Sequence, residues 1–124
     1  MKMINSWALP IETVSEGNQR EHWHKAARRH TKQKDLINLF LKKDLPLYIN
    51  KKITVKLIRI SPRMLDEHDN LRFSFKWIVD AVANLLNPGL KAGRADDSDL
   101  ITWEYDQEKG KPKEKAIRIE IYGR

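Results

Sequence analysis

The sequence predicts an α+β fold: one domain in which a mixed sheet of about four strands packs against two main helices. Two kinds of hydrophobic pattern support this prediction. Some segments alternate apolar and polar residues as β-strands do, and two longer segments carry apolar residues at helical spacing. They follow one another as strand, helix, strand, helix, strand, strand, an order typical of helices packed on a mixed sheet. A chain of 124 residues has room for one core, so we expect a single domain over residues 1–124.

The chain is basic and contains no cysteine. Its 24 Lys and Arg residues outnumber its 17 Asp and Glu residues, which gives a formal net charge of +7. This balance favours a polyanionic partner such as DNA, although many domains are basic for solubility alone. The lack of cysteine excludes disulfides and thiolate metal sites. No apolar run approaches the roughly 20 residues of a membrane span and no signal peptide is evident, so we expect no membrane contact and a cytoplasmic location.

The first strand and the first helix are predicted in the N-terminal third of the chain. Trp7–Val14 reads as a short strand, and Pro10 suits a strand at the edge of the sheet. Asn18, with Glu21 three residues later, resembles a capping box. We therefore expect a long helix over residues 19–43.

The first half of this helix is basic and the second half is apolar. The basic half is able to hold DNA phosphates without reading sequence, although such a charge run is also typical of a solvated helix face. Trp23 is expected in the core. His22 and His24 do not share a helical face, which argues against a histidine metal site. The candidate DNA-binding residues are Arg20, Lys25, Arg28, Arg29 and Lys32, with Arg72 further along the chain.

Three further strands are predicted. Ile53–Ile60 is rich in β-branched residues and becomes apolar on both faces, so we place it inside the sheet. Residues 101–105 alternate Ile, Trp and Tyr with Thr and Glu, and residues 117–121 alternate Ile with Arg and Glu. The lysine-rich loop 109–113 between them predicts that the last two strands form a hairpin.

A second helix is predicted between the second and third strands, from an acidic start at Asp69 to Leu86. Asp69, Lys76 and Asp80 fall on one face of it, opposite the apolar residues. Taken singly, Asp69 is explained as a helix cap, and Lys76 with Asp80 as a surface pair. The predicted core stripe consists of Leu71, Phe75, Ile78, Val82 and Leu85.

Two groups of carboxylates flank this helix. The first acidic cluster is Asp66, Glu67 and Asp69, and the second acidic cluster is Asp96, Asp97 and Asp99. The first follows the predicted central strand and the second precedes the next strand, so we expect both to meet at one edge of the sheet. Crowded carboxylates repel one another unless a cation lies between them, and oxygen ligands suit Mg²⁺ or Mn²⁺. Such a metal beside phosphate-binding lysines is typical of phosphodiester hydrolysis.

Several short motifs of this region resemble the RusA family of Holliday junction resolvases, most closely a phage-associated branch of it. The segments from Ser15 to Trp23 and from Trp103 to Gly110 are also similar to that branch. The resemblance therefore covers most of the chain, from about Ser15 to Tyr122. The motifs that carry it are Asp69-Asn70-Leu71, Lys76, Asp80-Ala81 and Asp96-Asp97.

The resemblance implies a homodimeric, Mg²⁺-dependent endonuclease, with Mn²⁺ as a substitute, that cuts two strands symmetrically at branched DNA such as a four-way junction. The catalytic acids of the family fall on Asp69 and Asp97, and its basic residue falls on Lys76. The family has an Asp two residues before the Asp of its Asp-Asn pair, where this chain has Glu67, with Asp66 one residue earlier. The implied catalytic acids are thus Asp69, Asp97 and Glu67, and the implied metal ligands are drawn from Asp66, Glu67, Asp69, Asp96 and Asp97.

Two other functions are open at this point. The basic helix and the departure at Glu67 favour a DNA-binding module without nuclease activity. Its affinity for DNA would depend on salt and would not change with Mg²⁺. A structural protein whose acids only cap helices would not bind DNA at moderate salt.

Overall fold

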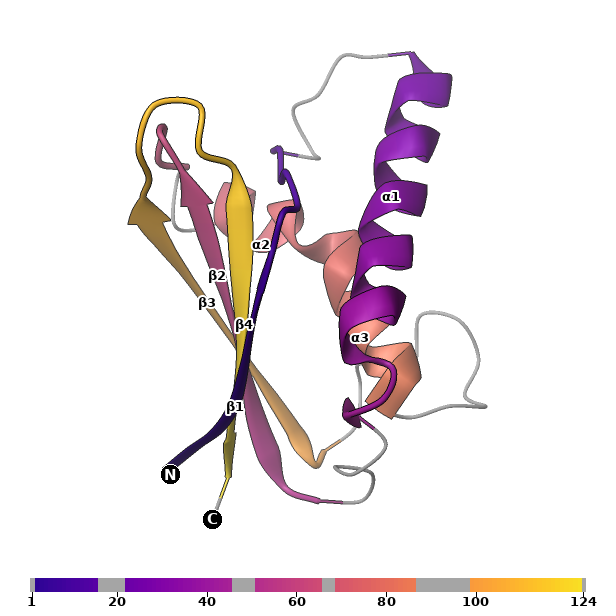
Figure 1. Ribbon diagram of the computed structural model, residues 1–124, viewed down its shortest axis with the longest axis vertical. Helices are drawn as coiled ribbons and strands as arrows, with labels where there is room; N and C mark the ends of the chain where they lie inside the picture. The colour runs from indigo at the N-terminus through magenta and orange to yellow at the C-terminus, as the bar shows by residue number, and fades with distance from the viewer. Residues whose placement is uncertain (1, 16–21, 46–50, 66–68, 87–98, 124) are drawn as a thin grey trace.

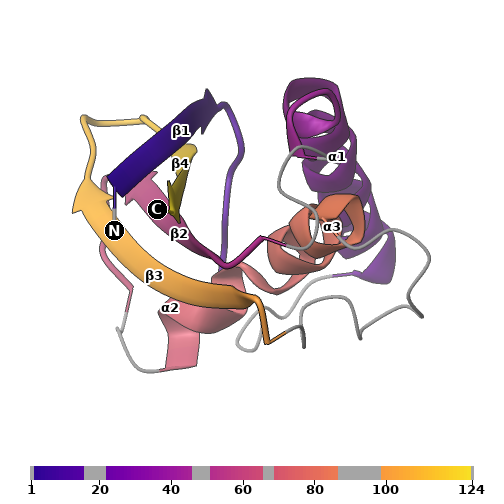
Figure 2. The same ribbon diagram turned by 90° about the horizontal axis from the view of Figure 1, so that it is seen from below.

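The computed structural model describes residues 2–15, 22–45, 51–65, 69–86 and 99–123. In chain order the elements are β1 (Lys2–Leu9), α1 (Trp23–Leu41), β2 (Ile53–Ser61), α2 (Asp69–Ser74), α3 (Lys76–Leu86), β3 (Ile101–Lys109) and β4 (Ala116–Gly123). The four strands form one sheet, α1 and α3 lie on the same side of it, and α2 lies beside β3 (Figures 1 and 2). This arrangement confirms the predicted α+β class. None of the helices in these ranges has the length and apolarity needed to cross a membrane.

The sheet is mixed, with strand order β1-β4-β2-β3, so β1 and β3 are its edges. β2 runs parallel to β3 and antiparallel to β4, and β4 runs antiparallel to β1. The chain passes from β2 to β3 through α2 and α3, because parallel strands need a crossover rather than a tight turn. β2 is paired along both sides, which confirms the prediction that Ile53–Ile60 lies inside the sheet.

The predicted hairpin between the last two strands is wrong. β3 and β4 follow each other in the chain, but β2 lies between them in the sheet. The strand-order prediction failed because apolar β2 takes a neighbour on each side, burying residues on both of its faces, such as Leu57 and Ile58. The connection at residues 110–115 is long enough for this, since crossing two strand spacings requires only about 10 Å.

The first strand is displaced from its predicted position. It spans Lys2–Leu9 instead of Trp7–Val14, although it is an edge strand as Pro10 suggested. Pro10 comes directly after the strand and donates no backbone hydrogen bond, so it marks the end of the pairing. The pairing with β4 shifts register between Met3 and Asn5, and this irregularity hides the alternation expected of a strand.

Helix α1 begins at Trp23, later than predicted. Its N-cap is His22, whose extended backbone (φ −65°, ψ 140°) lets the ring Nδ1 accept a hydrogen bond from the backbone N–H of His24 at 3.3 Å. His22 thus does what was predicted of Asn18, and Asn18 and Glu21 lie outside the described residues. α1 buries only its second half, since its buried residues are Gln33, Ile37 and Leu41.

The second predicted helix is divided into α2 and α3 at Phe75. The Phe75 N–H bonds to the Arg72 carbonyl at 3.1 Å, the tighter spacing of a 3₁₀ turn. The Ser74 hydroxyl also donates to the Leu71 carbonyl at 2.6 Å and so competes with the helical hydrogen bonds. The predicted core stripe is nevertheless confirmed: Leu71, Phe75, Ile78 and Val82 are buried, and Leu85 is partly buried against the same core.

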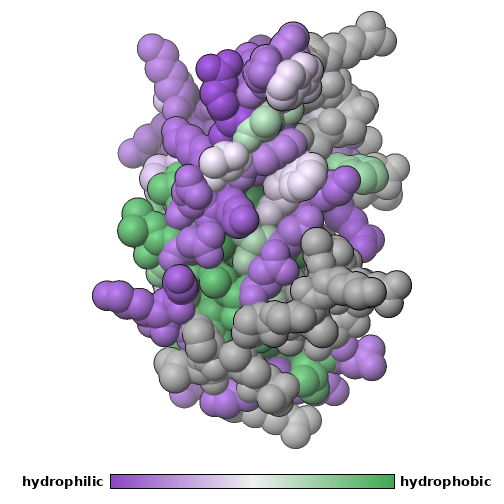
Figure 3. All heavy atoms as spheres, turned by 90° about the vertical axis from the view of Figure 1, so that its right-hand side faces the viewer, coloured by the Kyte–Doolittle hydropathy of each residue, from purple (hydrophilic) through white to green (hydrophobic). Residues whose placement is uncertain are grey.

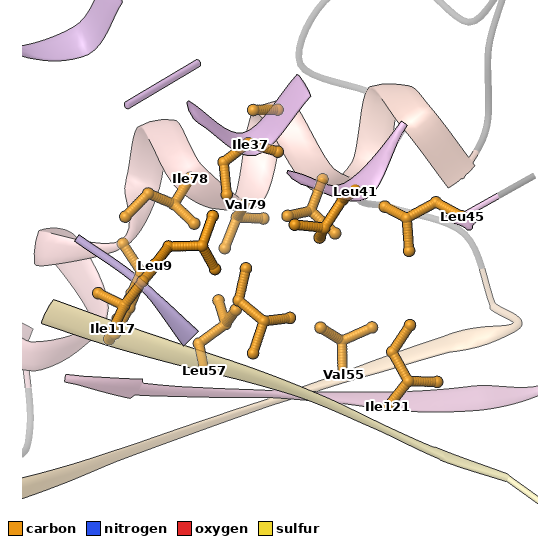
Figure 4. Packing of buried hydrophobic residues seen from close by; sticks show 14 of the residues in the cluster. Leu9, Ile37, Leu41, Leu45, Val55, Leu57, Ile78, Val79, Ile117 and Ile121 are labelled. Atoms are coloured by element: carbon orange, nitrogen blue, oxygen red, sulfur yellow. The ribbon is translucent and has the colours of Figure 1, made fainter. Parts of the chain in front are cut away.

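The core lies between the sheet and helices α1 and α3. Leu41 of α1 and Ile78 of α3 point toward Val55, Leu57 and Ile121 of the sheet (Figure 4). These five side chains are all fully buried. Truncation of one such residue, for example Leu57 to Ala, costs about 2–5 kcal/mol of stability.

Candidate nucleic-acid interface

Most of the predicted metal ligands fall outside the described residues, namely Asp66, Glu67, Asp96 and Asp97. Asp69 is the first residue of α2, and Lys76 is the first residue of α3. Within the described ranges, no group of three or more His, Asp or Glu side chains is arranged to hold a metal ion. The Mg²⁺ site therefore stays a prediction.

The described residues next to the two acidic clusters lie along the same edge strand, β3. Before the first cluster, Leu65 exchanges two hydrogen bonds with the Gln107 carboxamide, at 2.7 and 2.9 Å. In α2, the Arg72 guanidinium lies 5.8 Å from the centroid of the Tyr105 ring. In the second cluster, Asp99 lies two residues before β3 begins. Gln107 is about 20 Å along β3 from that end of the strand.

Four of the candidate DNA-binding residues lie on one face of α1. Lys25, Arg28, Arg29 and Lys32 follow the spacing i, i+3, i+4 and i+7, which places them in one stripe of the helix. They line a cavity of about 440 Å³, and Lys115 lines it from the loop before β4. The surface on the α1 side is largely hydrophilic, with apolar residues between (Figure 3). We call this cavity the basic groove, defined by Lys25, Arg28, Arg29, Lys32, Glu12 and Lys115.

The wall opposite α1 is formed by Pro10, Ile11, Glu12 and Val14, and two buried polar side chains hold this segment in place. Gln33 of α1 donates from Nε2 to the Glu12 carbonyl at 3.0 Å. Arg59 of β2 donates to the Thr13 hydroxyl at 3.0 Å, and burial lowers the pKa of Arg59 while the Glu12 carboxylate opposes that shift. These two hydrogen bonds attach the segment to α1 and to β2. The positions of α1 and β2 therefore set the distance between the two walls of the groove.

Two contacts outside the basic groove involve the starts of α2 and α3. Directly after Val14, the Ser15 hydroxyl donates to Asn70 Oδ1 at 3.1 Å, and Asn70 directly follows Asp69. On α1, the His30 ring stacks on the Trp77 ring, with centroids 4.2 Å apart and planes at 26°. Trp77 directly follows Lys76. Val14 of the groove is therefore one residue from the contact with α2, whereas His30 lies on the side of α1 that faces α3, about 150° around the helix axis from the basic stripe.

Lys76 itself is exposed to solvent. Its Nζ lies 5.2 Å from the centroid of the neighbouring Trp77 ring, a cation–π distance. A weak, exposed contact of this kind leaves the ammonium group able to pair with a phosphate.

Sequence reasoning missed two residues of the groove, Glu12 and Lys115, which form an ion pair at 3.2 Å. They meet because antiparallel pairing sets Leu9 opposite Ile117, so that the chain just past β1 lies beside the chain just before β4. The predicted hairpin paired the last strand with residues 101–105 instead. Only the correct strand order would have revealed this contact.

The other two candidate DNA-binding residues do not belong to the groove as described. Arg72 is exposed on α2 beside Tyr105 and does not line the cavity. Arg20 lies outside the described residues. The predicted set thus divides into a groove on α1 and one arginine near the edge of the sheet.

The first turn of α1 corrects two expectations. Trp23 is not in the core, since 66% of its surface is exposed. The buried residues of α1 begin at Gln33, about 15 Å further along the helix axis, so Trp23 lies beyond the packed part. His22 and His24 also lie together, with ring centroids 4.9 Å apart, because His22 precedes the helix as its cap.

No protein-family model matches the chain, and no curated protein matches it either. The resemblance to the RusA family therefore rests on the residues quoted for it and enters below as part of a proposal.

Proposed function

We propose that this protein is a Mg²⁺-dependent endonuclease that cuts branched DNA, such as a Holliday junction, by paired symmetric hydrolysis. The observation that supports this most directly is the position of the basic groove. Val14 of the groove directly precedes Ser15, whose hydroxyl contacts Asn70 beside Asp69 at the start of α2. A polyanion that extends from the groove past Val14 would reach the start of α2, where the RusA resemblance assigns a catalytic acid to Asp69.

The residues of this chain have distinct roles in the proposed reaction. Lys25, Arg28 and Lys32 hold phosphates on either side of the cut through charge, without reading sequence. Exposed Lys76 pairs with the scissile phosphate and offsets its negative charge. The candidate ligands are carboxylates, the oxygen donors that Mg²⁺ prefers. When bound, Mg²⁺ lowers the pKa of its water and stabilises the charge of the transition state, and Mn²⁺ substitutes for it.

The proposal includes a homodimer. Two symmetric cuts on a four-way junction need two active sites in a fixed relation, and a two-fold dimer supplies them. Size-exclusion chromatography with light scattering, on the protein alone and on its junction complex, measures this directly.

Cleavage of a labelled four-way junction, compared with a linear duplex of the same arms, tests the nuclease. We expect paired nicks on the junction with Mg²⁺ or Mn²⁺ and none with EDTA. Asp69→Asn and Asp97→Asn should lower the rate by at least about 100-fold, since each removes a negative ligand oxygen. Lys76→Met should lower it by about tenfold or more, as expected for one lost phosphate charge.

Asp99→Asn is the matched control. Asp99 is an exposed carboxylate two residues after Asp97 and belongs to neither set of implied ligands. This variant should cut at a rate within about twofold of the parent, because it keeps every proposed ligand. If Asp69→Asn cuts the junction as fast as the parent, the proposed active site is wrong.

A DNA-binding module without nuclease activity is the second candidate. The observation that favours it is Glu67, which stands where the RusA family has Asp. This function predicts tight, salt-dependent junction binding through the basic groove and no nicking in either metal. If Glu67→Asp gains metal-dependent nicking, the fold carries a nuclease site and the binding module is no longer the better explanation.

A further inference from the structure

We propose that the first turn of α1 is a stacking site for an unpaired DNA base, continuous with the basic groove that holds the backbone of the same strand. The site consists of His22, Trp23 and His24, which we call the aromatic cap. This inference rests on the proposed function only in taking DNA as the ligand. It does not require cleavage.

The aromatic cap presents an indole ring to solvent. Trp23 is 66% exposed, although its ring lies against that of His24, with centroids 3.4 Å apart and planes at 36°. An indole that keeps most of its surface exposed forgoes much of the burial that makes tryptophan stabilising in a core. Among the described residues that line the basic groove, none is aromatic.

The three rings of the cap are held together by local structure. The centroids of His22 and Trp23 are 5.7 Å apart, and those of His22 and His24 are 4.9 Å apart, with planes at 28° and 22°. The bond from the His24 backbone N–H to His22 Nδ1 fixes the first ring against the helix start. A ring arrangement that is already fixed loses little conformational entropy when a base stacks on it.

A second hollow on α1 links His24 of the cap to the basic groove. His24 lines a shallow second hollow on α1 together with Arg28 and Lys32. Arg28 and Lys32 also line the groove. Trp23 and Lys32 are nine residues apart on the helix, or about 13 Å, which is the length of about four stacked nucleotides.

This combination fits single-stranded DNA better than a duplex. Aromatic rings bind bases of any identity by stacking, and cations beside them track the backbone phosphates. In a duplex the bases already stack on one another, so the exposed indole gains little contact. An unpaired base at a branch point is free to stack, and the neighbouring cations supply the charge complementarity.

Binding of a fluorescein-labelled 12-nucleotide oligo-dT, measured by anisotropy in EDTA, tests the site. Trp23→Ala should weaken oligo-dT binding about tenfold and change the affinity for a 12-base-pair duplex less than twofold. Trp23→Phe should retain most of the affinity, because a phenyl ring also stacks. Oligo-dT should quench the tryptophan fluorescence of the parent and quench Trp23→Phe much less.

Phe40→Ala is the matched control, because Phe40 is an exposed aromatic residue at the other end of α1. It should leave oligo-dT binding within twofold of the parent. Unchanged oligo-dT binding by Trp23→Ala, or an equal loss for oligo-dT and duplex, would overturn the stacking site. Since EDTA prevents cleavage, a protein that fails the junction assay and still shows the Trp23 effect disproves the nuclease and supports this site.

Discussion

The basic groove has an excess of cationic side chains, whereas on the open face of the sheet cationic and acidic side chains pair with one another. In the groove, five lining side chains among the described residues are cationic and one, Glu12, is acidic. On the open face, the side of the sheet away from the core, cations and carboxylates pair within the protein. Arg118 bonds to Glu108 and Glu120, and Lys56 lies 3.6 Å from Asp106.

The difference follows from the secondary structure that carries each region. On β-strands, opposite charges on neighbouring strands meet at short distance, as Lys56 of β2 and its diagonal neighbour Asp106 of β3 do. On α1, like charges at helical spacing share one stripe and have few acids opposite them. Like charges brought together weaken a fold unless a partner of opposite charge binds. Of the two regions, the groove is therefore the one whose charges a bound anion would neutralise.

Neutralising two cations in each region should give the largest difference between the groove and the open face, measured as affinity for junction DNA. Arg28→Gln/Lys32→Gln should weaken junction binding by about tenfold to 100-fold. It should also make the slope of log affinity against log salt shallower by about 1.8, since each phosphate contact contributes about 0.9. Electrophoretic mobility shift at four salt concentrations gives both values.

Lys56→Gln/Arg118→Gln is the matched variant from the open face and lowers the net charge of +7 by the same two units. Its salt slope should equal that of the parent, because its cations pair with carboxylates of the same sheet. Equal losses in the two double variants would mean that overall charge, and not the groove, holds DNA.

Arg59, which holds the wall of the groove, and Arg118, on the open face, should contribute differently to the stability of the fold. Arg59 is 6% exposed and donates to the Thr13 hydroxyl and to the Arg63 carbonyl, whereas the Arg118 side chain is 30% exposed and lies in a surface ion-pair network. Arg59→Met removes a desolvation cost but leaves two polar groups without their charged partner. Hydrogen bonds to charged groups contribute about 1.5–3 kcal/mol each, so the loss dominates.

We expect Arg59→Met to lower the free energy of unfolding by about 2 kcal/mol, and Arg118→Met by less than about 1 kcal/mol. Urea denaturation followed by circular dichroism measures both. A stability of Arg59→Met equal to that of the parent would show that desolvation of the buried guanidinium cancels its hydrogen bonds.

The fold class and the charge stripe were predictable because they depend on local pattern. The apolar run of β2 and the core stripe of α2 and α3 follow from periodicity alone, and both are confirmed. Lys25, Arg28, Arg29 and Lys32, chosen from the sequence as candidate DNA-binding residues, lie on one side of the groove, and their binding of DNA stays a prediction. These patterns are read within a single element, and no knowledge of its neighbours is needed.

The errors concern relations between elements. The hairpin failed because strand order depends on which neighbours β2 accepts, and Glu12 and Lys115 were missed for the same reason. Trp23 was assigned to the core because the sequence does not show how far α1 extends beyond the sheet. The acidic clusters lie mainly outside the described residues, so their meeting at one edge of the sheet stays a prediction.

The smallest expected effect is a change in how the stability of the fold depends on acid pH, caused by an ion pair on the open face. On the open face, the hydrogen bond from Arg118 lowers the pKa of Glu108 below its ordinary value of 4.5. A carboxyl whose pKa is lower in the folded protein stabilises the fold above the ordinary value, and this stability is lost as the pH falls through the lowered pKa. Because the pair is exposed, we expect it to contribute only a few tenths of a kcal/mol.

Glu108→Gln should therefore reduce stability slightly at pH 7 and flatten the decline of stability below pH 4.5, as measured by urea denaturation from pH 7 to pH 3. Arg118→Gln should flatten the same part of the curve, because it removes the donor that lowers the Glu108 pKa. The double variant should match either single variant there, since one interaction accounts for the effect. An additive effect of the two substitutions would mean that Glu120, the other partner of Arg118, carries part of the acid dependence.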